Sequence, residues 1–290
     1  MTSFNERADE AVGILGRLVA LTAVTLLVVF LSGIALKPVF PDGIPPGLDG
    51  RILLALILGF ALAVAHVVVV ALLEQGHWRL TGFHKESWHP LGLGLGAAAG
   101  AVAVLSPGAA LVLTGQLEAA STSPGEWLPF AVGTLAAVSA LAAAEELIFR
   151  GYLFGLLLDR WGAAAALLLT SFVFAAVHAF NPGATIVSLA AVASAGLMLG
   201  AVRVRTGSTV AAWLAHTAIN WVQAAVLRLP VSGLELAPPP GHRLESHGAP
   251  WLTGGAWGLE GGAAAAGAFL LISFLLLGAR APASSSARRR

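Results

Sequence analysis

Long uncharged apolar runs dominate this chain and restrict it to one class of structure. About eight runs are long enough to cross a bilayer, whose apolar core of roughly 30 Å requires about 20 helical residues. Lipid offers no partner for unpaired backbone groups, so open sheets cannot span it and each run is expected to be helical. We therefore predict an all-α, polytopic transmembrane helix bundle with about eight spanning helices, at residues 12–36, 51–73, 90–114, 127–158, 163–180, 184–202, 208–228 and 262–280.

Composition supports a membrane protein and excludes several functions. The 290 residues are 57% hydrophobic and only 11% charged, whereas a soluble domain has about 25% charged residues. The net charge of +1 argues against a nucleic-acid partner and leaves membrane lipids as the expected surroundings. The chain has no cysteine, which excludes disulfides, thiolate catalysis and cysteine metal sites.

The predicted organisation is a single transmembrane helical domain at 12–280, with a catalytic core at about 127–228. A cytoplasmic segment precedes it at 1–11, and a disordered basic tail follows at 281–290. The first apolar run is too long for a signal-peptide core, so we expect it to be retained. More Lys and Arg residues lie on the side of the two termini, which predicts that both are cytoplasmic. The Ala-, Gly- and Arg-rich composition is typical of a GC-rich genome and favours a prokaryotic cell membrane.

Two glutamates and an arginine interrupt the fourth run, in "AAAEELIFRG" at 142–151. Ionisable residues inside a membrane usually face the bundle interior or a water-filled cavity and mark functional sites. Glu146 and Arg150 are four residues apart, so they can pair on one helix face. Glu145 points about 100° away and has no partner in its own helix. A structural ion pair is the alternative for Glu146 and Arg150, but it leaves Glu145 unexplained.

Two later runs carry further polar residues at helical spacing. Phe174 and His178 are four residues apart in one run, and His216 and Asn220 share one face of another. Alternating helix directions bring these groups to the depth of Glu145. An interfacial or turn-capping role is the alternative for His178, and interhelical hydrogen bonding is the alternative for His216 and Asn220.

A free carboxylate, two histidines and an amide suit the hydrolysis of an amide bond by an activated water. The carboxylate is a candidate general base, and N–H groups of imidazole and amide can stabilise an oxyanion. Alternatively, Glu145, His178 and His216 bind a divalent metal such as zinc, which activates the water. The residues alone leave both alternatives open.

These residues resemble the motifs of the CAAX-protease and bacteriocin-processing family, also called the Abi or type II CAAX prenyl endopeptidase family. Its E-E-x-x-x-R motif matches Glu145, Glu146 and Arg150, and its F-x-x-x-H motif matches Phe174 and His178. Its H-x-x-x-N motif matches His216 and Asn220. Each motif alone is weak evidence for the family. All three in order, each on its own apolar run, are strong evidence.

The resemblance implies an intramembrane endopeptidase in which Glu145 activates water with the help of His178. It implies that His216 and Asn220 stabilise the oxyanion, and that Glu146, Arg150 and Phe174 support the site. The family is often classed as metalloproteases, although a metal-free glutamate mechanism is also argued for it. The implied substrate is a peptide or protein, prenylated or membrane-embedded. A non-catalytic scaffold or immunity protein of the same fold and a proton-coupled transporter are the alternative functions.

Overall fold

The computed structural model describes residues 4–41, 50–234 and 239–278 and confirms the predicted all-α fold. Two short antiparallel strands are the other regular elements of these residues. In chain order the elements are α1 (Phe4–Leu36), α2 (Gly50–Leu73), the 3₁₀ turn η1 (Lys85–Trp88), α3 (Pro90–Leu113), β1 (Leu117–Ser121), α4 (Trp127–Phe149), α5 (Tyr152–His178), α6 (Ile186–Thr206), α7 (Thr209–Trp221), the π-helical turn η2 (Val222–Val226), β2 (His242–Ser246), α8 (Pro250–Thr253), the 3₁₀ turns η3 (Gly255–Trp257) and η4 (Leu259–Gly261), and α9 (Ala263–Gly278).

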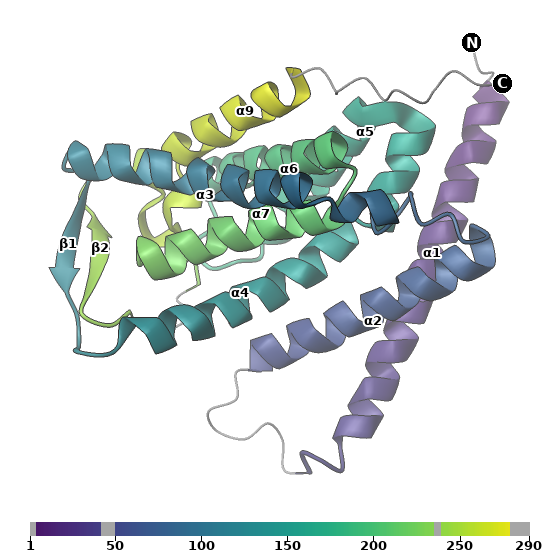
Figure 1. Cartoon of the computed structure of the whole chain (residues 1–290), viewed down its shortest axis with the longest axis horizontal. Coiled ribbons are helices and arrows are strands. Elements are labelled where there is room, and N and C mark those ends of the chain that lie inside the picture. The colour runs from purple at the N-terminus through teal and green to yellow at the C-terminus, as the bar shows by residue number, and fades with distance from the viewer. Residues whose placement is uncertain (1–3, 42–49, 235–238, 279–290) are drawn as a thin grey trace.

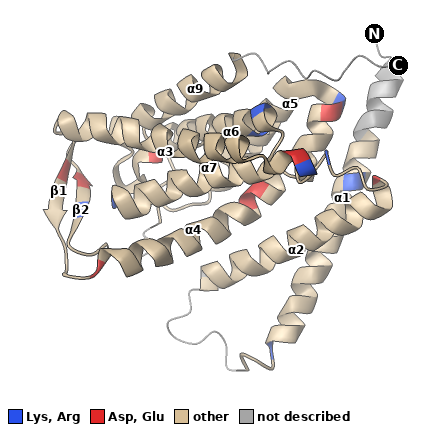
Figure 2. Ribbon diagram, viewed as in Figure 1, with Lys and Arg blue, Asp and Glu red and all other residues tan. Residues whose placement is uncertain are grey.

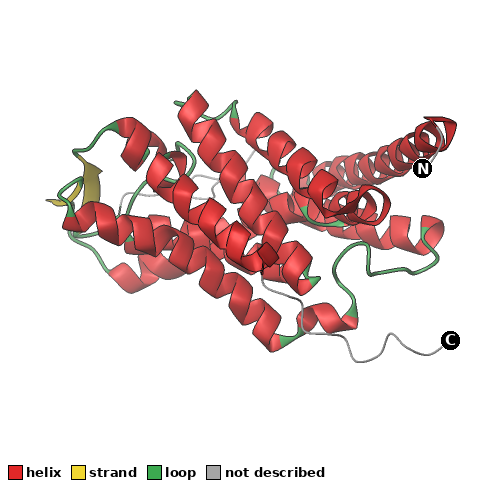
Figure 3. Cartoon of the chain, turned by 90° about the horizontal axis from the view of Figure 1, so that it is seen from above, coloured by secondary structure: helices red, strands yellow, loops and turns green. Residues whose placement is uncertain are grey.

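Helix α6 forms the centre of the bundle and contacts α5, α7 and α9 (Figure 1). Helix α7 also packs against α3 and α4, so it links the central helix to two outer ones. Helices α1 and α2 pack against each other at one side of the molecule and join the bundle mainly through α2 and α4 (Figure 1). Figure 3 shows the N-terminal end of the chain on the side away from the two short strands. The bundle of α3–α9 therefore contains all of the helices that carry the predicted site residues.

The surface of the bundle is suited to lipid. Five helical stretches are long and apolar enough to cross a membrane. Large apolar side chains lie on the outside, with exposures of 90% for Phe180, 86% for Ile186 and 86% for Leu113. Charged residues are sparse along the helices, apart from the acidic segment of α4 near its junction with α5 (Figure 2). Exposed apolar area of this extent marks a membrane-facing surface, so the chain is a multi-pass membrane protein.

The predicted boundary between the fourth and fifth helices, at 158–163, is wrong. Helix α4 ends at Phe149, and α5 begins at Tyr152 and bends at Gly162, whose φ of +83° is left-handed. His66 of α2 explains the break, because its Nε2 accepts a hydrogen bond from the Tyr152 backbone N–H at 3.1 Å. Its Nδ1 donates to the Leu62 carbonyl at 2.7 Å. The acidic segment therefore lies in the last turns of α4 rather than in the middle of a long helix.

Other boundaries also differ from the prediction. Helix α1 begins at Phe4, inside the segment expected to precede the membrane domain. Strands β1 and β2 were not predicted, and β2 lies in the segment 229–261 that was expected to be a loop. Helix α9, which corresponds to the predicted span 262–280, runs over Ala263–Gly278 within the described residues. The predicted tail at 281–290 lies outside the described residues, and the cytoplasmic location of both termini stays a prediction.

Two glycines allow α3 and α7 to approach closely. A Cβ atom at Gly96 would collide with the carbonyl oxygen of Ala211, and one at Gly100 would collide with that of Ala215. Small residues are the usual means of bringing membrane helices into backbone contact. Because His216 directly follows Ala215, this contact also fixes the position of a predicted site residue.

Candidate active site

The C-terminal end of α4 holds a buried ion pair. The Nη1 atom of Arg150 lies 3.0 Å from the Oε1 atom of Glu146, and both side chains are almost fully buried. Arg150 also donates from Nη2 to the Gly196 carbonyl of α6 at 3.0 Å. Its guanidinium carbon lies 4.7 Å from the centre of the Phe174 ring. The pair predicted from the four-residue spacing is therefore formed, and it joins α4 to α5 and α6.

Arg203 of α6 stabilises the end of α4 from the other side. This residue is only 3% exposed. Its Nε donates to the Arg150 carbonyl at 3.1 Å, and the Thr209 hydroxyl donates to the same oxygen at 2.8 Å. A cation and a hydroxyl donor satisfy a carbonyl that a helix C-terminus leaves unpaired. The last turn of α4, with its two glutamates, is thus held rigidly.

His216 of α7 lies between the two glutamates. Its Nδ1 is 2.8 Å from Glu146 Oε1, and its Nε2 is 3.9 Å from Glu145 Oε2. The first distance is a hydrogen bond from the ring N–H to the carboxylate, while the second is longer than one. Glu145 keeps 34% of its side chain exposed, in contrast to the buried Glu146. Glu146 therefore orients the ring. Glu145 is the more exposed acid, and its Oε2, the oxygen nearer His216, is buried without a hydrogen-bond partner among the described residues.

Two tryptophans set the register of α7 against α4. The Trp213 indole donates to the Ser139 carbonyl at 2.8 Å, and the Trp221 indole donates to the Ala131 carbonyl at 2.9 Å. These bonds lie on either side of His216 along α7. They fix the position of α7 along its axis relative to α4, so the contact between His216 and Glu146 depends on them.

Phe174 and His178 come from the end of α5. His178 Nδ1 donates to the Phe174 carbonyl at 2.7 Å, which leaves Nε2 as the acceptor in the neutral ring. The Phe174 ring lies 4.5 Å from the ring of His178 and 5.9 Å from that of His216, measured between centroids. Phe174 is thus an apolar spacer that contacts both histidines and the Arg150 guanidinium.

Asn220 lies one helical turn beyond His216 on the same face of α7. Its side chain is buried, and its Oδ1 has no hydrogen-bond partner among the described residues. No hydrogen bond in this part of the chain links it to Glu145 or to either histidine. Directly after Trp221 the helix widens into the π-helical turn η2, a distortion that is frequent at functional sites.

The two histidines open onto one small cavity. Its volume is about 20 Å³, sufficient for one water molecule. Two of its polar lining residues, Ser232 and Glu260, were not predicted from the sequence. Glu260 stands alone in "WGLEGG" at 257–262, and an acid in such an apolar surrounding was the available signal. The lining comprises Phe174, His178, Val192, Ala195, Leu199, His216, Ile219, Ser232 and Glu260.

The predicted metal ligands do not form a metal site in this arrangement. Among the described residues, no three His, Asp or Glu side chains are grouped closely enough to bind a metal ion. Glu145, His178 and His216 have suitable donor atoms, and Glu145 Oε2 lies 3.9 Å from His216 Nε2, but the three do not converge on one point. The chemistry proposed below therefore uses no metal ion in any step.

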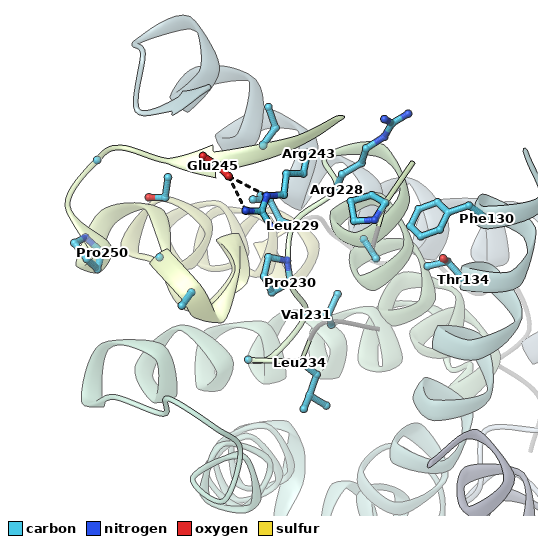
Figure 4. Close-up of a pocket in the computed structure, with 18 residues that line it drawn as sticks. Phe130, Thr134, Arg228, Leu229, Pro230, Val231, Leu234, Arg243, Glu245 and Pro250 are labelled. Atoms are coloured by element: carbon cyan, nitrogen blue, oxygen red, sulfur yellow. Dashed lines mark hydrogen bonds and ion pairs between the residues drawn. The ribbon is translucent and has the colours of Figure 1, made fainter. Parts of the chain in front are cut away.

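A larger cavity of about 670 Å³ lies at the end of the bundle that carries β2 (Figure 4). Apolar side chains such as Phe130 and Leu229 line it together with two arginines. Arg243 pairs with Glu245 through Nη2 at 2.7 Å, while Arg228 donates to the Pro240 carbonyl at 2.6 Å. The cavity combines apolar walls with charged groups, as binding sites for amphipathic ligands do.

Comparison with known families identifies the class of this helical membrane protein. Residues 126–222 match the family model described as type II CAAX prenyl endopeptidase Rce1-like. The match runs from the start of α4 to the end of α7 and includes all seven predicted site residues, and it confirms the predicted family. The segment 126–222 is therefore what resembles the CAAX protease family, a family of membrane peptidases. No curated protein and no solved structure matches the chain.

Proposed function

We propose that this protein is an intramembrane endopeptidase in which Glu145 activates the attacking water. The observation that carries the proposal is the position of His216, whose two ring nitrogens face the carboxylates of Glu146 and Glu145. One acid orients the ring, and the other remains accessible for proton transfer. A buried ion pair with a purely structural role would not require the second acid.

In the proposed reaction, the Glu145 carboxylate takes a proton from water while the oxygen attacks the peptide carbonyl carbon. His178 assists, because its Nε2 has a free lone pair when Nδ1 donates to the Phe174 carbonyl. When the tetrahedral intermediate collapses, the C–N bond breaks and the proton held by Glu145 passes to the leaving amine. This exchange is general base catalysis followed by general acid catalysis by the same carboxyl group.

His216 and Asn220 are proposed to donate hydrogen bonds to the developing oxyanion. Donation from His216 Nε2 requires protons on both ring nitrogens. Glu145 and Glu146 on either side of the ring balance the resulting positive charge. The Asn220 side chain supplies a neutral N–H from the next turn of α7. Fixed donors of this kind contribute a large part of the rate enhancement in acyl transfer.

The substrate proposed for this reaction is a peptide or protein segment, prenylated or membrane-embedded. Membrane lipids surround the bundle, and the larger cavity supplies an apolar surface with arginines at the end that carries β2. Because the described residues lack a group of three metal ligands, the proposal assigns no role to zinc. A chelator added to the assay tests that choice directly.

The test is cleavage of fluorogenic peptides, prenylated and unprenylated, by the protein purified in detergent. We expect Glu145→Gln and His178→Ala to lower kcat by at least about 100-fold, because each removes a proton-transfer group. His247→Ala is the matched control, since the exposed His247 side chain lies beside Glu118 of β1 and outside the candidate site. Full activity of Glu145→Gln would contradict the proposal, and activity lost on chelation would contradict its metal-free form.

A further inference from the structure

Residues of one tight turn line both the small histidine cavity and the larger cavity. Val231 and Leu234 exchange backbone hydrogen bonds, with N···O distances of 2.9 and 2.8 Å. Ser232 lines the small histidine cavity, while its neighbours Val231 and Gly233 line the larger cavity. Figure 4 shows Val231 and Leu234 at the larger cavity. The turn Val231–Leu234 is therefore a partition between the space available to a ligand and the cavity at the histidines.

This partition is not stable by its own backbone geometry. Ser232 has a φ of +50°, a left-handed conformation that is unfavourable for any residue with a Cβ atom. Gly233 follows with a φ of +77°, which glycine adopts freely. A serine in this conformation persists only where the surrounding structure determines it.

The restraint on Ser232 comes from Glu260 of η4. The Oε1 atom of Glu260 accepts hydrogen bonds from both the backbone N–H and the hydroxyl of Ser232, at 2.6 and 2.7 Å. Glu260 is only 6% exposed. Its own backbone N–H donates to the side-chain oxygen of Gln223 at 2.9 Å, which fixes η4 against η2. Two hydrogen bonds that one carboxylate oxygen accepts thus hold the partition in place.

Neighbouring contacts hold the other side of the turn. Asn181 of the loop between α5 and α6 donates from Nδ2 to the Ser232 carbonyl at 3.1 Å. The Gly233 N–H donates to the Trp257 carbonyl at 2.9 Å. These two bonds come from uncharged groups. Among the described residues, Glu260 is the charged residue that bonds to the turn.

We propose that Glu260 is a positioning residue of the active site, which clamps the Val231–Leu234 turn and so keeps the histidine cavity closed to ligands in the resting protein. The functional part of this proposal rests on the proposed peptidase activity, because closing the cavity affects catalysis only if the reaction occurs there. Glu260 lies outside the segment that matches the family model. The clamp is thus a feature that the C-terminal part of this chain adds to the helices that carry the motifs.

The clamp can be tested without any substrate, because the natural chain has no cysteine. Ala195 lines the small cavity and is 8% exposed, so Ala195→Cys places a thiol behind the partition. We expect a charged methanethiosulfonate reagent to modify this thiol slowly. In the double variant with Glu260→Ala, the rate of thiol modification should rise by about tenfold or more, because the turn then opens more frequently.

Two controls separate local opening from damage to the fold. Glu260→Gln keeps an oxygen that can accept both Ser232 hydrogen bonds, so it should restore the slow modification rate. Ala103→Cys lies fully buried in α3, away from both cavities, and should stay unreactive with Glu260→Ala. An unchanged rate for Ala195→Cys with Glu260→Ala would overturn the clamp. Equal rates with Glu260→Ala and Glu260→Gln would also overturn it.

Peptide cleavage gives a second readout for the functional part of the proposal. Opening of the cavity should lower KM in Glu260→Ala, because binding no longer requires a rarely populated state. The same change should lower kcat, because the wall beside the histidines is lost. A simple loss of folded enzyme would reduce the apparent kcat and leave KM unchanged, and that result would contradict the positioning role. If wild type cleaves no peptide, the proposed function fails while thiol modification still decides the clamp.

Discussion

Glu146 and Glu260 are both buried carboxylates near the site histidines, one bonded to His216 and the other lining the histidine cavity, yet their partners differ in kind. Glu146 contacts two cationic or ionisable groups, the Arg150 guanidinium and the His216 ring. Glu260 contacts two neutral donors of Ser232. Burial raises the pKa of the Glu260 carboxyl, an effect that the Ser232 hydrogen bonds and the nearby His178 and His216 offset only in part. The comparison indicates that charged partners suit a carboxylate that orients a histidine, whereas neutral donors suit one that holds the backbone.

The largest expected effect follows from removing the charge partner of Glu146. Arg150→Leu should destabilise the protein by about 3–5 kcal/mol, because it leaves a buried carboxylate without its cation. Thermal unfolding in detergent, followed by tryptophan fluorescence, measures this change. The double variant with Glu146→Leu should recover part of the stability but none of the peptidase activity. Recovery of both would show that the pair is not needed to orient His216.

A second expected effect concerns the helix contact that brings His216 to Glu146. Gly100→Ala should lower the stability by about 1–3 kcal/mol, because the added methyl group collides with the α7 backbone. It should also lower kcat, because His216 would move away from Glu146. Gly94→Ala is the matched control, since a Cβ atom there meets no other atom within 4 Å. Equal effects of the two substitutions would argue against a close-packing role for Gly100.

The smallest expected effect is the pH dependence that Glu260 gives to stability. Because the pKa of its carboxyl is raised in the folded protein, the folded state retains a proton that the unfolded state releases above about pH 4.3. Stability should therefore fall as the pH rises from that value through the raised pKa, by at most about 1.4 kcal/mol per pH unit. Unfolding of Glu260→Gln between pH 5 and 8 should lack this contribution, whereas the exposed Glu118→Gln should keep it. A wild-type slope that Glu260→Gln leaves unchanged would contradict the assignment.

Sequence reasoning succeeded where the relevant interaction lies within one helix. The apolar runs specify the helices because lipid leaves the backbone no other regular structure. The spacing of Glu146 and Arg150 specifies their ion pair because residues four apart are neighbours on a helix. The break at Gly151 could not be found in this way. It depends on His66, a residue of another helix, which accepts the N–H that Tyr152 would otherwise direct into α4.

The parts of the site that were missed depend on contacts between distant segments. The hydrogen bond from His216 to Glu146 requires the register that Trp213 and Trp221 impose on α7. Ser232 and Glu260 meet only because η4 packs against the turn after η2. No local pattern encodes these contacts. Strands β1 and β2 were missed for a related reason, since each is five residues long and gains its hydrogen bonds from the other.

The size of the histidine cavity has a kinetic consequence. A space of about 20 Å³ holds a water molecule but not a peptide bond with its neighbouring atoms. Under the proposed function and the proposed clamp, a substrate reacts in a minor population in which the Val231–Leu234 turn has moved. The apparent affinity for substrate is then reduced by the fraction of molecules that are open. A peptidase regulated in this way spares the many apolar helices that diffuse past it and cleaves those segments that stabilise the open state.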